Sequence, residues 1–160
     1  MEQNRAKKRV VDSATQSSKI IRQEDINGQH RLFGGRLMEW IDEVGALTAM
    51  RRCGGLVTTL AVDQLLFKHG AYLNQVIVLE GKVTYVGNTS MEVRVDTYAE
   101  EIPTGNRVAI NHAYLIFVHV DEDGKPVPIP YGLDLRSYRE QAEWDAALLR
   151  AQSRKERYAY

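Results

Sequence analysis

The sequence predicts an α+β fold in which a long curved antiparallel sheet wraps around one central helix, with an extra helix at the C-terminal end. Three observations support this prediction. Residues 34–52 form one apolar stretch with the length of a buried helix. Long segments rich in β-branched residues follow it, and the chain ends in a charged segment with a single apolar stripe.

The chain of 160 residues suits one domain with a core of its own. We divide it into a polar N-terminal segment (residues 1–18), a sheet-and-helix domain (19–124) and a proline-containing linker with the C-terminal helix (125–160). Within the domain we expect a short strand from Lys19 to Gln23, followed by a polar loop up to Arg31.

The central helix is expected from Gly34 to about Arg52, because this stretch has no proline and Gly54-Gly55 can end it. Its large apolar residues spread around most of a helical wheel, which indicates a helix covered on most sides. They are Leu37, Met38, Trp40, Ile41, Val44, Leu47 and Met50.

Strands are expected at Leu56 to Lys68 and Val76 to Val86, and Gly87-Asn88 is a two-residue hairpin signal after the second. In the next strand the residues alternate, as in an antiparallel sheet with one wet face. Met91, Val93 and Val95 would face the core, while Glu92, Arg94 and Asp96 would face outwards.

The last long strand is expected from Arg107 to Val120, between turns at residues 103–106 and 121–124. Three prolines make residues 125–133 extended and irregular. Ser137 and Glu140 form a capping-box pattern at the start of the final helix. Its apolar stripe comprises Trp144, Ala147, Leu148 and Ala151.

Composition excludes several classes of protein. Lys+Arg and Asp+Glu both total 21, so net charge gives no reason to expect nucleic acid as a partner. A single cysteine, Cys53, cannot form an internal disulfide, and no segment has the apolar length of a signal core or membrane span. We therefore expect a cytoplasmic protein without a membrane partner, and the histidines lack the spacing of metal ligands.

The pair Gly34-Gly35 stands where the central helix should begin. The first N–H groups of a helix have no intrahelical acceptors and carry partial positive charge, and glycine lets a ligand carbonyl approach them. The pair therefore predicts an oxyanion hole. The alternative is that glycine only permits close packing of the helix on the sheet.

Asp42 adds a carboxylate to this helix. On a helical wheel it lies with Gly35, Gly45, Ala46 and Ala49, a seam of small residues. A carboxylate beside a close-packed seam is costly unless it is hydrogen-bonded or functional, although Asp42 could instead extend the solvated Glu39 and Glu43 face.

Eight residues of helix span about 12 Å, too far for Asp42 to serve a carbonyl held at Gly34-Gly35 of its own chain. A second copy with an antiparallel helix would bring Asp42 to the other chain's diglycine, and the small residues would allow the helices to approach. The sequence thus predicts at least a homodimer with two composite sites.

These features resemble the acyl-CoA thioesterases of the hotdog fold, in particular the acyl-CoA hydrolase branch. The resemblance runs from about Asn27 to Glu100. It rests on Asn27, Leu32-Phe33-Gly34-Gly35, Leu37-Met38-x-Trp40-Ile41-Asp42-Glu43, Val57-Thr58-x-x-x-Val62-Asp63, Phe67 and Gly87-Asn88-Thr89-Ser90-Met91-Glu92-Val93.

The resemblance implies hydrolysis of a fatty acyl-CoA to free acid and CoA. In similar enzymes an aspartate like Asp42 is the catalytic carboxylate, acting as nucleophile or general base, an asparagine like Asn27 orients water or substrate, and Gly34 and Gly35 polarise the thioester carbonyl. Residues that would contact substrate or CoA are Phe33, Gly87, Asn88, Thr89 and Ser90. The resemblance implies no cofactor beyond the CoA of the substrate. It also implies a hexamer made of three dimers.

Two alternatives remain open. A non-catalytic acyl-CoA sensor could keep the glycine end without needing Asp42. A hotdog hydratase or dehydratase would pair His30 with the partner's Asp42, although the Pro- and Gly-rich loop that such enzymes have around the histidine is absent here. Many thioesterase relatives carry glycine at the position of His30. Thr89 and Ser90 could bind CoA or only satisfy turn backbone.

Overall fold

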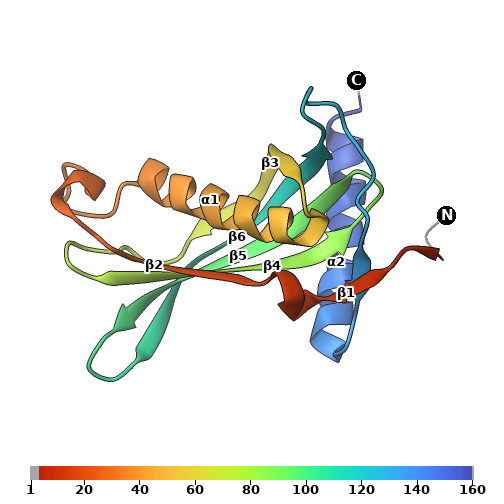
Figure 1. Cartoon of the computed structure of the whole chain (residues 1–160). Coiled ribbons are helices and arrows are strands. Elements are labelled where there is room, and N and C mark those ends of the chain that lie inside the picture. The colour runs from red at the N-terminus through yellow and green to blue at the C-terminus, as the bar shows by residue number, and fades with distance from the viewer. Residues whose placement is uncertain (1–3, 160) are drawn as a thin grey trace.

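Five strands form one antiparallel sheet in the order β2-β4-β5-β6-β3. The computed structural model describes residues 4–159, and Figure 1 shows α1 crossing one face of this sheet while α2 lies behind the other. The strands are β2 (Thr15–Ile20), β3 (Leu56–Phe67), β4 (Val76–Val86), β5 (Ser90–Glu101) and β6 (Asn106–Val120), and the helices are α1 (Gly34–Cys53) and α2 (Tyr138–Arg157). The predicted sheet around one central helix, with an extra C-terminal helix, is confirmed.

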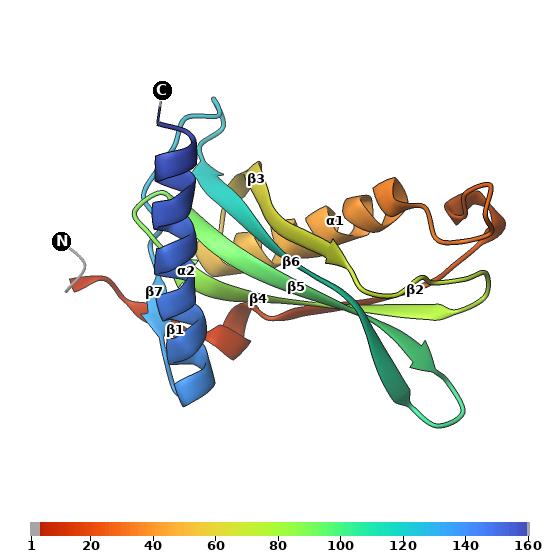
Figure 2. The ribbon, with the colours of Figure 1, turned by 180° about the vertical axis from the view of Figure 1, so that it is seen from behind.

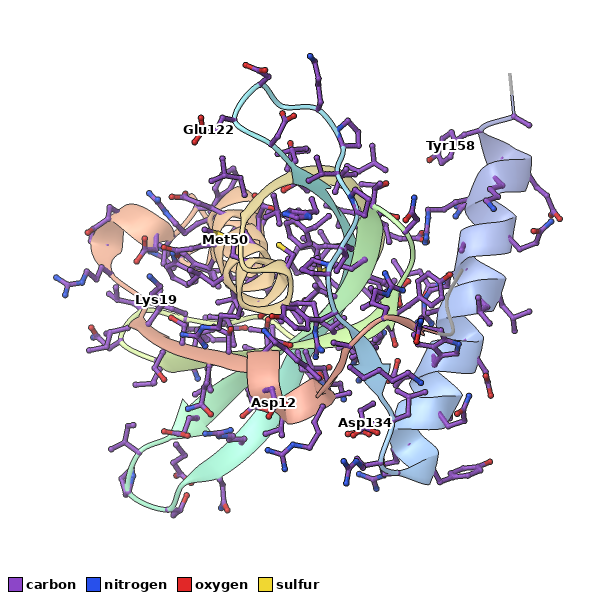
Figure 3. All side chains as sticks on the ribbon, turned by 45° about the vertical axis from the view of Figure 1, so that its right-hand side comes forward. Asp12, Lys19, Met50, Glu122, Asp134 and Tyr158 are labelled. Carbon is purple, nitrogen blue, oxygen red and sulfur yellow. The ribbon has the colours of Figure 1, made fainter. Side chains whose placement is uncertain are left out.

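Helix α1 has the predicted extent and ends at Gly54, whose φ of 71° is the left-handed conformation that glycine adopts easily. Its inward face, which includes Leu37, Ile41 and Val44, is buried against the sheet. Figure 3 shows side chains filling the space between α1 and the sheet. The core of the protein lies in this layer.

The expectation that α1 is covered on most sides is wrong for a single chain, since Leu47 is 41% exposed and Met50 39%. The small-residue seam also has a different role from the expected one. Gly45 faces the chain's own sheet, where an added Cβ would lie 2.9 Å from the Phe117 ring, and Ala49 is fully buried. These two residues therefore bring α1 close to its own sheet rather than to a second helix.

The alternation in β5 is confirmed on the side that faces α1, where Met91, Val93 and Val95 are buried. The prediction for its other side is wrong, because Glu92 is only 1% exposed. Helix α2 covers that face of the sheet (Figure 2), and its Arg150 lies 2.8 Å from the Glu92 carboxylate. A local pattern could not reveal this cover.

Helix α2 starts as predicted, with Ser137 as N-cap and its side chain accepting a hydrogen bond from Glu140 N. Trp144 packs against Tyr85 with tilted rings at a centroid distance of 4.5 Å, and Ala147 is buried. Leu148, predicted to belong to the packed stripe, is 44% exposed. The helix combines this narrow apolar contact with ion pairs to the sheet, from Glu143 to Arg94, Arg150 to Glu92 and Arg154 to Asp63.

The N-terminal residues join the fold earlier than expected. Strand β2 ends at Ile20, and Gln23–Asp25 forms a 3₁₀ turn, so the strand predicted at residues 19–23 is misplaced. β1 (Lys7–Arg9) pairs in parallel with β7 (Gly132–Asp134), inside the segment expected to be irregular. The buried Arg52 guanidinium donates hydrogen bonds to Lys8 O, Arg9 O and Gly132 O, which ties both strands to the end of α1.

The turns lie where the sequence predicts them, although three residues rather than two connect β4 and β5. The β5–β6 hairpin extends beyond the other strands (Figure 1). Within residues 4–159, no helix is long and apolar enough to cross a membrane.

Candidate active site

The diglycine forms the N-terminal end of α1. Phe33 is the N-cap, its side chain makes no capping hydrogen bond, and the first turn contains no acidic residue. The N–H groups of Gly34 and Gly35 therefore keep the partial positive charge of a helix terminus. An added Cβ at Gly35 would lie 2.5 Å from the Phe33 ring, whereas one at Gly34 would meet Phe67 at an ordinary 3.6 Å. The close contact at Gly35 is with the neighbouring exposed Phe33 ring, and Gly34 has no close contact, so packing of α1 on the sheet requires neither glycine.

Asn27 lies on an exposed loop next to this helix end. Its side-chain oxygen accepts hydrogen bonds from Gln29 N (2.9 Å) and Arg31 N (3.2 Å), so the loop orients the amide group. A cavity of about 380 Å³ opens beside the loop. Its lining includes Asn27, Gly34, Leu37, Phe67, His69 and Ala71, so the structure brings Asn27 and Gly34 together.

Asp42 is half-buried, two turns further along α1. Its Oδ1 accepts a hydrogen bond of 2.7 Å from Thr59 Oγ1 on the neighbouring strand β3. The carboxylate therefore faces β3 and is held in orientation, which favours the interpretation of Asp42 as a fixed functional group over that of a solvated surface residue.

One chain does not bring Asp42 to the diglycine. Gly34 lies beside Phe67, the last residue of β3, whereas Asp42 contacts Thr59 near the other end of the same strand. Along the helix the two positions are about 12 Å apart. The carboxylate also lies outside the lining of the cavity that contains Asn27 and Gly34.

The loop at Gly87 to Ser90 lies at the Asp42 end of the sheet, because Val118 pairs with both Ser90 and Thr58. Its backbone is well anchored. Arg5 donates to Gly87 O at 2.8 Å, and Ile129 N donates to Asn88 O at 2.8 Å. Thr89 and Ser90 are half-buried on this rigid loop.

Phe33 is 56% exposed, so its ring lies on the surface beside the diglycine, as a substrate contact would require. His30 occupies a turn in the Asn27 loop with a φ of 59°, and its backbone N–H donates to Asn27 O. This left-handed conformation favours glycine, which gives a physical reason why a glycine would suit position 30.

Strand β3 forms a free edge of the sheet in this chain. A row of large apolar side chains along it is exposed, and α1 also carries exposed apolar residues. They are Leu56, Leu60, Val62, Leu66 and Phe67, with Leu47 and Met50 of α1.

Another cavity, of about 580 Å³, lies beneath α2 on the opposite face of the sheet and is lined in part by Arg94, Tyr114 and Glu143. Burial raises the pKa of Tyr114 there. None of the predicted site residues lines it. Among residues 4–159, no three His, Cys, Asp or Glu side chains are grouped as metal ligands would be.

Thr59 was missed by sequence reasoning. Threonine is common in strands, so its presence in one indicates no particular role. The available signal for a partner of Asp42 was a hydroxyl residue in the first strand after the helix that carries this carboxylate. Its partner lies 17 residues away in the chain, so only the packing of α1 on β3 identifies it.

Residues 29–105 match the family model described as the thioesterase superfamily. An uncharacterized acyl-CoA thioester hydrolase of Bacillus subtilis is 39% identical over 106 residues, which cover 66% of this chain but only 62% of that protein. A crystal structure described as an apo-hexameric acyl-CoA thioesterase has a TM-score of 0.91 and 35% identity, covering 96% of this chain and 98% of its own.

An acyl-CoA hydrolase from Staphylococcus aureus, solved in complex with butyryl coenzyme A and coenzyme A, has a TM-score of 0.87 and 31% identity, covering 94% of this chain and 91% of its own. Three further structures of that hydrolase each carry one substitution to alanine. The replaced residues are an aspartate, an asparagine and a threonine, and the asparagine variant is in complex with coenzyme A.

Proposed function

The chain belongs to the thioesterase superfamily and has its hotdog fold, and on that premise we propose that it is an acyl-CoA thioesterase, which hydrolyses acyl-CoA to a free carboxylic acid and CoA. The observation that carries this proposal is the Asp42 carboxylate, held 2.7 Å from Thr59 Oγ1 on a helix whose N-terminal N–H groups remain uncapped. Together they supply the base or nucleophile and the oxyanion donors that thioester hydrolysis needs.

The active site is composed of two chains. Asp42 and Gly34-Gly35 are about 12 Å apart along one helix, so one chain cannot place both on the same thioester. A two-fold dimer formed through the exposed edge of β3 and the adjacent side of α1 places Asp42 of one chain near the diglycine of its partner. Three such dimers make the hexamer, an assembly that a similar thioesterase forms.

The residues divide the chemistry between them. The N–H groups of Gly34 and Gly35 hydrogen-bond to the thioester oxygen and stabilise the negative charge that develops on it. Asn27 orients the water or substrate. Phe33 and the loop from Gly87 to Ser90 contact the substrate, with Thr89 and Ser90 directed to its CoA part.

Asp42 can act by two routes. As general base, it takes a proton from water while the water oxygen bonds to the carbonyl carbon, and the C–S bond then breaks to release the CoA thiolate. As nucleophile, it forms a mixed anhydride that water hydrolyses. After a single turnover in ¹⁸O-labelled water, label in Asp42 identifies the anhydride route, because only attack of water on the aspartyl carbon of the anhydride places it there.

The Staphylococcus aureus hydrolase supports this assignment of roles. The residue types replaced in its variants, aspartate, asparagine and threonine, are those of Asp42, Asn27 and Thr59. In this chain these residues lie on α1, on the loop before it and on the strand beside it. We propose further that the enzyme acts in the cytoplasm and needs no cofactor besides the CoA of its substrate.

Thiol release from palmitoyl-CoA tests the proposal. We expect Asp42→Ala to lower the rate at least about 100-fold, since a catalytic carboxylate is lost. Equal, measurable rates for wild type and variant would reject the catalytic role of Asp42, whereas no hydrolysis by either would favour an acyl-CoA sensor. Hydration of an enoyl thioester that depends on His30 would instead support the hydratase alternative.

A further inference from the structure

A buried carboxylate links the Asn27 loop to the first turn of α1. Asp25, two residues before Asn27, is only 6% exposed. Its Oδ1 lies 3.1 Å from Arg36 Nε, its Oδ2 accepts from Arg22 N at 2.9 Å, and its backbone oxygen accepts from Phe33 N at 2.8 Å. Asp25 therefore contacts the chain on both sides of the loop.

Arg36 is the third residue of α1, directly after Gly34-Gly35. Its guanidinium has two carboxylate partners of different kinds. Asp25 is buried and lies outside the helix, whereas Glu39 belongs to α1, is 64% exposed and accepts from Arg36 Nη1 at 2.8 Å. Only the pair with Asp25 connects the helix to the loop.

The loop between these anchors is exposed from Asn27 to Arg31. A bridge between Ile26 and Leu32 closes its base, a second bridge joins Arg31 to Tyr72, and hydrogen bonds within the loop hold Asn27. These contacts orient Asn27 relative to its own loop. At the base of the loop, the backbone bond from Phe33 N to Asp25 O and the side-chain pair between Asp25 and Arg36 hold the loop against the first turn of α1.

We propose that Asp25 is a positioning residue of the thioesterase, which through Arg36 sets the distance between the Asn27 amide and the oxyanion donors Gly34 and Gly35. This inference rests on the proposed function. Asp25 touches neither substrate nor reacting atoms. It acts by holding two groups that must contact the same thioester, and catalysis is sensitive to displacements of about 1 Å.

Charge gives Asp25 a second role. A cation in the first turn of a helix opposes the helix dipole, and an unpaired Arg36 would be free to move towards a nearby substrate anion. The ion pair with Asp25 holds the Arg36 guanidinium and so opposes such a movement.

The test compares two isosteric variants that each remove one carboxylate from Arg36. We expect Asp25→Asn to lower kcat for palmitoyl-CoA by at least about tenfold with KM within about twofold, because substrate binding elsewhere is unchanged. Glu39→Gln, the matched control, removes the exposed partner and should leave kcat at the wild-type value.

Arg36→Gln provides an independent variant. We expect it to lower kcat as much as Asp25→Asn, and the double variant to be no slower than either, because all three lose the same link. Each protein is assayed well below its own melting temperature. The proposal would be overturned if Asp25→Asn or Arg36→Gln left kcat unchanged, or if Asp25→Asn lowered kcat no more than Glu39→Gln does. It would also be overturned if the losses of kcat in the two single variants added up in the double variant, or if neither single variant folded.

The proposed function is judged separately in the same assay. It stands if wild type and Glu39→Gln release thiol while Asp42→Ala does not, whatever Asp25→Asn does. If wild type itself releases no thiol from acyl-CoA, the proposed function fails, and the positioning role fails with it.

Discussion

Thr59 Oγ1 donates a hydrogen bond of 2.7 Å to Asp42 Oδ1. This bond joins strand β3 to the middle of α1. Within residues 4–159, Oδ2 of Asp42 has no hydrogen-bond partner, so one oxygen is fixed and the other is available for chemistry. A carboxylate with one anchored oxygen presents the second in a defined direction, as a base or nucleophile requires.

Replacing this anchor should slow the reaction without unfolding the protein. We expect Thr59→Val, which keeps the shape of the side chain, to lower kcat by about 10- to 100-fold. Thr58→Val is the matched control, because neighbouring residues in a strand point to opposite faces. Equal kcat values for the two variants in a thiol-release assay would contradict a role for the Thr59 hydroxyl.

Mixing two inactive variants tests the composite site. Asp42→Ala lacks the carboxylate, and Gly35→Val disturbs the helix end, where even a Cβ would lie 2.5 Å from the Phe33 ring. Co-expression in equal amounts should restore about a quarter of wild-type activity, since half of the dimers are mixed and each has one complete site.

The comparison for this mixing experiment is each variant expressed alone, which should remain inactive while showing a cooperative melting transition. If a single chain held the whole site, no combination of the two variants would regain activity. Recovery is measured as thiol release per milligram of purified oligomer.

His30→Gly should make the protein more stable. The φ of 59° at His30 costs a residue with a Cβ more than it costs glycine, so the free energy of unfolding should rise by up to about 1 kcal/mol. Thioesterase activity should stay the same, because His30 has no part in the proposed reaction. Gln29→Gly is the control, because residue 29 has ordinary backbone geometry, and it should lower the free energy of unfolding. Urea denaturation of both variants shows whether the two changes in the free energy of unfolding differ in sign.

The ion pair between Glu92 and Arg150 should be important for the attachment of α2. Arg150→Met leaves a carboxylate that is 1% exposed without its main partner, and we expect a loss of about 3 kcal/mol in the free energy of unfolding. Arg136→Met removes an exposed pair with Asp134 and should cause no comparable loss. If the two variants had equal urea midpoints, the burial of Glu92 would have no energetic role.

Cys53 supplies a prediction about pH. Burial raises the pKa of its thiol above the ordinary value of 9.0, so the folded state keeps the thiol neutral when the unfolded state would ionise it. The contribution of the neutral thiol to the free energy of unfolding is complete below pH 9 and is lost as pH rises further. The stability of wild type relative to Cys53→Ala should therefore decrease between pH 8 and pH 10, and a constant difference in urea midpoints across this range would argue against it.

Local signals were sufficient for much of the fold. The apolar wheel of residues 34–52, the glycine at 54 and the alternation at 91–95 each act within a few residues, so α1 and the inward face of β5 could be predicted. Strand β2 could not be placed, because its sequence is mostly polar and its boundaries are set by pairing with β4 from Thr15 to Ile20. The capping pattern at Ser137 and Glu140 was local and held, whereas the exposure of Leu148 depended on how α2 lies on the sheet.

The sequence alone predicted the glycine pair and Asp42 as groups of the site, because residue type and spacing along one helix are visible in the letters, while Asn27 was predicted from the resemblance to hotdog thioesterases. Only the tertiary structure selected Thr59 as the partner of Asp42, buried Glu92 under Arg150 and linked Asp25 to Arg36. These contacts join residues 17, 58 and 11 positions apart, respectively. Such pairs arise from the packing of one element on another, which no local pattern of hydrophobicity or charge contains.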